Sequence, residues 1–104
     1  MKFLCFVIAD FDKAAEMSQA SDKLWANPPA GVKMLALYSC FGSPPGVLLP
    51  PHSFLAVCVM EAENVEVLFS ASAPALNAGG SVYYVPVVDV PVTGSAEAVE
   101  RLGV

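Results

Sequence analysis

The most regular hydrophobic segment of the chain is residues 53–60, Ser-Phe-Leu-Ala-Val-Cys-Val-Met. It contains no charged residue, glycine or proline, and its β-branched and aromatic residues favour a β-strand. Apolar side chains occupy both sets of alternate positions, which are Phe54, Ala56, Cys58 and Met60, and Leu55, Val57 and Val59. A strand with two apolar faces is covered on both sides. We therefore predict that this segment is a central strand.

Residues 2–9 repeat this pattern and predict another central strand. Its two apolar sets are Phe3, Cys5 and Val7, and Leu4, Phe6 and Ile8. From Lys13 to about Ala26 the period changes to that of a helix, with Asp10 or Asp12 as the expected cap. The inner face of this helix is expected to carry Ala14, Met17, Ser21, Leu24 and Trp25. The consecutive prolines that follow end it.

The middle of the chain predicts a strand, a long loop and a second helix. The strand runs from Val32 to about Phe41, and residues 42–52 then form an irregular segment with four prolines and two glycines. A loop of this length is either a rigid connection or a lid over a binding site, and both interpretations remain open. Residues 61–77 predict a helix that Asn64 caps and that Pro74 kinks or ends.

The last part of the chain predicts an edge strand and a short helix. Residues 81–90 have the composition of a strand but contain Pro86, which removes a ladder hydrogen bond and is tolerated at a sheet edge. Thr93 or Ser95 is expected to cap a helix that runs to Leu102.

The order of these elements, β-α-β-β-α-β with a terminal helix, predicts an α+β fold of the ferredoxin-like class. Its four-stranded antiparallel sheet has the first and third strands at the centre. One domain covers residues 1–104. Two helices can cover only one face of such a sheet, so the other apolar face needs a partner. We expect a homodimer in which two sheets pack together as a dimeric α/β barrel.

Composition strengthens the expectation of a homodimer and argues against other partners. Apolar residues make up 56% of the chain and charged residues only 14%, whereas about 25% charged residues is ordinary. The net charge of −5 and the five scattered basic residues argue against nucleic-acid binding. Prolines and glycines break the uncharged residues 34–60 into pieces too short to span a membrane. Three widely spaced cysteines predict free thiols in a reducing compartment, hence a cytoplasmic protein.

Three short runs of sequence carry a resemblance to known proteins. They are the opening strand, Pro-Pro-Ala-Gly-Val-Lys-Met-Leu at residues 28–35, and Tyr-Val-Pro-Val-Val-Asp at residues 84–89. Together with the element order, they resemble the dimeric α/β-barrel superfamily and, within it, an uncharacterised family of small single-domain proteins. Members of that family often continue the second run with Gly-Arg-Trp-His. This chain has Ala36, Leu37, Tyr38 and Ser39 instead, so the histidine that would be the natural acid or base is absent.

Four residues are candidates for binding a ligand: Trp25, Tyr38, Ser39 and His52. His52 is the only histidine, and histidine titrates near neutral pH. Tyr38 and Ser39 occupy the positions where the resembling proteins place an aromatic residue and a histidine. We expect any site to be a cleft between the second strand and residues 42–52, with Trp25 as a wall and an apolar small molecule as the ligand. The spacing of residues indicates no metal site and no cofactor.

Two functions are compatible with these features. The first is a non-catalytic homodimer that binds a small apolar ligand, because the sequence contains no recognisable nucleophile and base, ligand set or phosphate loop. The second, implied by the resemblance, is a cofactor-independent monooxygenase or isomerase with an apolar pocket. A buried cleft that joins Tyr38, Ser39 and His52 would favour the enzyme, and their dispersal would favour the binding protein.

Overall fold

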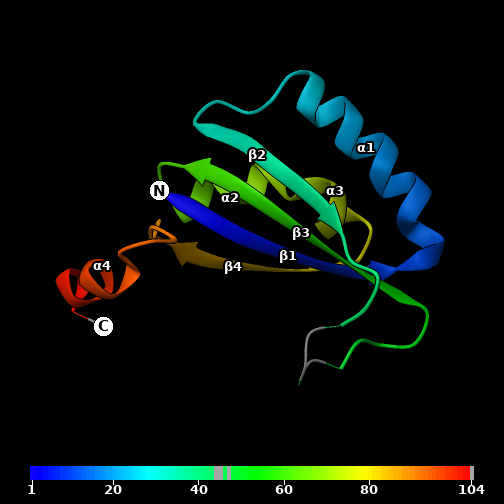
Figure 1. Cartoon of the computed structure of the whole chain (residues 1–104). Coiled ribbons are helices and arrows are strands. Elements are labelled where there is room, and N and C mark those ends of the chain that lie inside the picture. Colours follow the sequence, from blue (N-terminus) through cyan, green and yellow to red (C-terminus); the bar gives the residue numbers. More distant parts are fainter. Residues whose placement is uncertain (44–45, 47, 104) are drawn as a thin grey trace.

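The computed structural model describes residues 1–43, 46 and 48–103 (Figure 1). Its strands are β1 (Lys2–Asp10), β2 (Val32–Ser39), β3 (Ser53–Ala62) and β4 (Ser81–Val87). Its helices are the 3₁₀ turn η1 (Phe11–Lys13), α1 (Ala14–Ala26), α2 (Val65–Ala71), α3 (Ala73–Asn77) and α4 (Ser95–Leu102). The chain thus has an α+β fold with one open sheet and a C-terminal helix. Within the described ranges, no helix is both long and apolar enough to cross a membrane.

The four strands form an antiparallel sheet in the order β2-β3-β1-β4. The two strands with apolar residues on both faces, β1 and β3, are therefore the central ones, as their patterns predict. Pro86 lies in the edge strand β4, opposite Phe3 of β1. This position agrees with the prediction that a proline is tolerated where one side of the strand has no ladder to complete.

Helices α1, α2 and α3 lie on one side of the sheet, and α2 and α3 are seen behind the strands in Figure 1. The strands direct one set of alternate side chains towards them. The main core cluster joins Phe3, Cys5, Cys58 and Met60 of the strands to Leu68 and Ala71 of α2. A smaller cluster joins Ala9 of β1, Met17 of α1 and Ala75 of α3. The helix-covered face is thus the site of the hydrophobic core.

The opposite face of the sheet, which we call the open face, has no helix in front of it in Figure 1. Its central side chains are Leu4, Phe6 and Ile8 of β1, and Leu55, Val57 and Val59 of β3. One row of paired residues crosses all four strands of this face: Tyr38, Val57, Phe6 and Tyr83. Both tyrosines at the ends of the row are more than half exposed. The open face is therefore apolar and, apart from the buried Leu55, partly accessible in the single chain.

The predicted helix over residues 61–77 is wrong at its start, whereas the interruption expected near Pro74 is present. β3 continues to Ala62, because Glu61 lies opposite Lys2 on one neighbouring strand and Lys33 on the other, and opposite charges across strands stabilise the pairing. Asn64 does cap α2, since its side-chain oxygen accepts a hydrogen bond from the Val67 amide at 3.1 Å. The helix then breaks at residue 72, and α3 begins with a proline in its first turn.

Two predictions for the C-terminal region are also corrected. The last strand ends at Val87, not at residue 90. Neither Thr93 nor Ser95 caps α4, because the residue at the N-cap position is Gly94 and no side chain bonds to the first turn. Gly94 has a φ of 88°, which glycine adopts without steric cost. The chain therefore enters α4 through a left-handed backbone conformation at Gly94, which a residue with a side chain adopts less readily.

Candidate functional site

A pocket of about 330 Å³ lies between α1 and the helix-covered face of the sheet. Helix α1 forms one wall with Ala14, Met17, Ser18, Ser21, Asp22 and Trp25. The central strands form the floor with Cys5, Val7, Phe54, Ala56, Cys58 and Met60. Residues from the end of α2 and from α3 close a further side: Ala71, Ser72, Pro74 and Ala75. The pocket is thus part of the space between the two layers of the fold.

Small side chains explain why this space is not filled. Helix α1 approaches α3 and the sheet through Met17, which packs against Ala9 and Ala75. Around this contact, α1 presents Ser18 and Ser21 to the pocket, and neither side chain is long enough to reach the strands. Protein interiors are ordinarily close-packed, so a row of small residues at a layer interface leaves a volume that another molecule can occupy.

The lining of the pocket is mostly apolar and carries one acidic side chain, Asp22. Its polar groups are four serine hydroxyls and the Asp22 carboxylate. Ser72 is already engaged, because the Tyr84 hydroxyl donates a hydrogen bond to its oxygen at 2.6 Å. Burial raises the pKa of Cys5 and of Cys58 to about 11, and the proximity of Cys58 adds to the shift at Cys5. Both thiols are therefore protonated at neutral pH, and a protonated thiol is a weak nucleophile.

The structure brings two of the four sequence-predicted site residues to this pocket. Trp25 lines it from α1 and Ser39 from β2. Tyr38, the neighbour of Ser39, points to the open face, where 59% of it is exposed. His52 lies in the turn directly before β3 and is also exposed. Part of the loop expected as a lid, residues 44, 45 and 47, falls outside the described residues.

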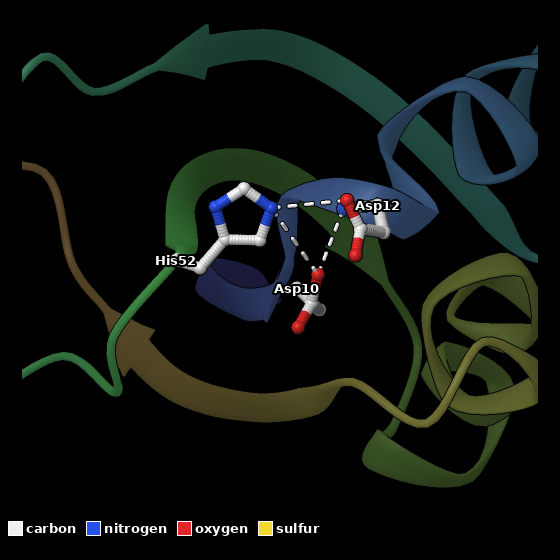
Figure 2. Close-up of side chains that lie close together, drawn as sticks. All are labelled: Asp10, Asp12 and His52. Atoms are coloured by element: carbon white, nitrogen blue, oxygen red, sulfur yellow. Dashed lines mark hydrogen bonds and ion pairs between the residues drawn. The ribbon is translucent and has the colours of Figure 1, made fainter.

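His52 belongs to a separate exposed cluster with two carboxylates (Figure 2). Its Nε2 atom lies 3.0 Å from an Asp12 carboxylate oxygen and 3.9 Å from one of Asp10. The Asp10 side chain also accepts a hydrogen bond from the Asp12 amide at 2.8 Å, which caps η1. The carbonyl of His52 accepts a hydrogen bond from the Phe11 amide at 2.9 Å. These bonds fasten the start of β3 to the end of β1.

The electrostatics of this cluster favour protonated His52. The hydrogen bond to Asp12 is the main cause that raises the pKa of His52 above its usual value, and the charges of Asp12 and Asp10 act in the same direction. Phe11 links the cluster to the pocket, because its ring lies 5.6 Å from the His52 ring and also lines the pocket. The cluster therefore stands beside the pocket rather than inside it.

The sequence contains signals for the pocket but not for the cluster. The predicted inner face of the first helix included Ala14, Met17, Ser21 and Trp25, and all four line the pocket. The short side chains of Ala14 and Ser21 on this face fill little of the space between the helix and the sheet. By contrast, 40 residues separate Asp12 from His52 in the chain. Only the pairing of Asp10 with Ser53 across the central strands brings these side chains together.

Comparisons with known proteins do not place the chain in a family. No protein-family description matches the sequence, and no curated protein matches it. One similar solved structure is a DUF3240 family protein from Shewanella baltica, with 12% identity, a TM-score of 0.44, and coverage of 89% of this chain and 97% of that one. Another is a dinuclear metal-binding peptidase of the M20 family from Bacillus subtilis.

The similarity to the peptidase is 16% identity with a TM-score of 0.40 over 98% of this chain and 32% of that one. Because both TM-scores are low, neither similarity indicates a function for this chain. Membership of the dimeric α/β-barrel superfamily, expected from three short runs of sequence, stays a prediction.

Proposed function

We propose that the protein is a homodimer that binds a small apolar molecule in the pocket between α1 and the sheet. The pocket is the observation that supports ligand binding. Its volume of about 330 Å³ is at the lower end of the roughly 300–1,000 Å³ found for ligand sites. Apolar walls with a few polar groups are also typical of such sites.

The lining favours a neutral aromatic ligand of one or two rings. Trp25 and Phe54 offer aromatic walls, and aromatic pairs gain energy beyond the area that they bury. The hydroxyl groups of Ser18 and Ser21 can donate a hydrogen bond to one oxygen atom of the ligand. A ligand with a carboxylate is disfavoured because Asp22 lies on the same wall and like charges repel. We therefore expect phenols, naphthols and related neutral molecules to bind best.

The second part of the proposal is that the open faces of two chains pack together. The sheet is four strands wide and seven paired residues long between β1 and β4, which is roughly 450 Å² per chain at the usual strand spacing. As flat projections, two such faces cover roughly 900 Å², slightly less than the ~1,000 Å² that a specific interface should exceed. The exposed Tyr38 and Tyr83 side chains add to this area. This arrangement is the dimeric α/β barrel formed by two ferredoxin-like units, and it would cover the row from Tyr38 to Tyr83.

The positions of Tyr38, Ser39 and His52 support the binding protein over the alternative, a cofactor-independent monooxygenase or isomerase. The three side chains belong to three different environments: the open face, the pocket and the exposed carboxylate cluster. A general base has to lie within hydrogen-bonding reach of the group that it deprotonates. An enzyme built on these residues would require a substrate that extends from the pocket past Phe11 to His52.

Calorimetric titration with 1-naphthol, a neutral two-ring compound with one hydroxyl, tests ligand binding. We expect saturable binding of one molecule per chain. Ser21→Leu places a larger apolar side chain in the pocket and should weaken binding by about tenfold or more, which corresponds to 1.4 kcal/mol. Ser70→Leu is the matched control, because Ser70 is exposed on α2 and does not line the pocket. Equal loss in both variants, or no saturable binding to the native protein, would refute the proposed site.

A further inference from the structure

The sulfur atoms of the chain are concentrated in the pocket. The chain contains three cysteines and four methionines. Five of these seven residues line the pocket: Cys5, Cys58, Met17, Met34 and Met60. The other two, Met1 and Cys40, are not part of its lining. Methionine and cysteine are common core residues. Their clustering in the pocket therefore indicates a binding site only if several sulfur atoms can contact the same ligand.

Strand pairing places the two thiols side by side. Cys5 lies directly opposite Cys58 in the β1–β3 ladder, and both are buried on the helix-covered face. Phe11 lies opposite His52 in the continuation of this ladder, and the Phe11 amide donates a hydrogen bond to the His52 carbonyl. Along an antiparallel ladder, hydrogen-bonded pairs alternate with pairs that have no hydrogen bond. Because an even number of positions separates the two pairs, Cys5 and Cys58 also form a hydrogen-bonded pair. In such pairs the Cα atoms are about 5.5 Å apart.

This spacing suits a bridging ion better than a sulfur–sulfur bond. A disulfide requires Cβ atoms roughly 3.5–4.5 Å apart, whereas the Cβ atoms of opposite residues in a ladder are about 4.5–5.5 Å apart and are closer in pairs without hydrogen bonds. Two thiols that share a metal ion need sulfur atoms no more than about 4.6 Å apart, because each metal–sulfur bond is about 2.3 Å. All three cysteines are free in the structure.

The methionines add thioether groups around the thiol pair. Met60 lies two residues beyond Cys58 on β3, and therefore on the same face of the sheet. Met34 lies opposite Met60 across the β2–β3 ladder. Met17 contributes from α1, on the other side of the pocket. Sulfur atoms from four different elements thus surround one volume.

We propose that the pocket binds a soft monovalent metal ion, Cu(I), between Cys5 and Cys58, with Met60 and Met34 as additional ligands. Thiolate and thioether sulfur atoms favour Cu(I), whereas Zn²⁺ uses thiolates, imidazoles and carboxylates. One thiol releases its proton when Cu(I) binds, so the complex of one thiolate, one thiol and the thioethers is uncharged. An uncharged complex suits an apolar pocket, where an unpaired charge is costly. This inference goes beyond ligand binding and does not depend on it.

Anaerobic titration of the full-length protein with Cu(I), in competition with bicinchoninate, tests the proposal. We expect one high-affinity ion per chain and an X-ray absorption spectrum with sulfur atoms alone in the first shell. Cys5→Ala and Cys58→Ala should each weaken binding by more than the roughly 10- to 100-fold that loss of an outer-shell partner costs. Cys40→Ala is the matched control and should bind like the native protein.

Met60→Leu keeps the side-chain volume and removes only the thioether, so it should weaken Cu(I) binding without unfolding the protein. Melting curves of all variants identify any loss of fold. The proposal is overturned if the folded Cys5→Ala and Cys58→Ala proteins retain native affinity, if Cys40→Ala abolishes binding, or if nitrogen and oxygen atoms fill the first shell. Binding of 1-naphthol without binding of Cu(I) would overturn the metal site alone and leave the apolar site intact.

Discussion

Replacing Val57 by aspartate tests whether the open face is the interface between two chains. Val57 lies in the middle of β3, with Phe6 and Tyr38 as its neighbours across the two ladders. Its side chain is only half-buried in the single chain. A carboxylate at this position would keep contact with water in a monomer, but a face-to-face dimer would bury it. We therefore expect Val57→Asp to prevent association more strongly than it affects folding.

The expected size of the effect follows from symmetry. A two-fold axis brings two copies of residue 57 into one interface, so each dimer would contain two unpaired carboxylates. Burial of an ion costs several kcal/mol even after relaxation. If each carboxylate costs only about 2–3 kcal/mol, the dimer loses about 5 kcal/mol, and the dissociation constant rises by about 10³ to 10⁴.

Sedimentation velocity at micromolar concentrations measures this change, and circular dichroism melting curves report on the fold. Val92→Asp introduces the same charge at a fully exposed position outside the sheet, and it should leave the dimer intact. The interface would be misplaced if folded Val57→Asp protein remained dimeric with unchanged affinity. A native protein that is monomeric at tens of micromolar would refute the homodimer itself.

Three further outcomes test the fold and its electrostatics. Leu68→Ala removes a wholly buried side chain of α2 and should lower the free energy of unfolding by about 3 kcal/mol in urea denaturation. Tyr84→Phe removes the hydrogen bond to Ser72 and should cost about 1–2 kcal/mol, with little further loss in a Ser72→Ala background. The pKa of His52 in proton NMR should lie above 6.5 and fall in Asp12→Asn. Since folding raises this pKa, the associated stabilisation is present below pH ~6.5 and is lost as pH rises through the folded-state value.

A specific result would contradict each of these three predictions. A change below about 0.5 kcal/mol for Leu68→Ala would place α2 outside the core, since surface substitutions have effects of that size. Fully additive losses for Tyr84→Phe and Ser72→Ala would show that the two hydroxyls do not interact. A His52 pKa that does not respond to Asp12→Asn would separate the imidazole from the carboxylates drawn in Figure 2.

The central part of the fold could be predicted from the sequence because local sequence patterns determine it. Apolar residues on both faces identify β1 and β3 as central strands, and Pro86 identifies β4 as an edge strand. The helical period of the first helix gives its inner face correctly. These features depend on local patterns of burial, which the order of residues records directly.

Other features depend on distances in space that no local pattern records. The continuation of β3 to Ala62 follows from Glu61 pairing with Lys2 and Lys33, which keeps residues 61 and 62 in the sheet. The pocket depends on how far α1 stands from the strands. The pairing of Cys5 with Cys58 depends on the register of the ladder. A shift of one residue in register would turn one of these side chains to the open face.

The most direct test of ligand binding is an NMR titration of protein labelled with ¹³C in its methionine methyl groups. Met17, Met34 and Met60 line the pocket, whereas Met1 lies outside it and is 70% exposed. Addition of 1-naphthol should shift the three pocket signals in a saturable way and leave the Met1 signal in place. Shifts confined to Met1, or equal small shifts of all four signals, would contradict binding between α1 and the sheet.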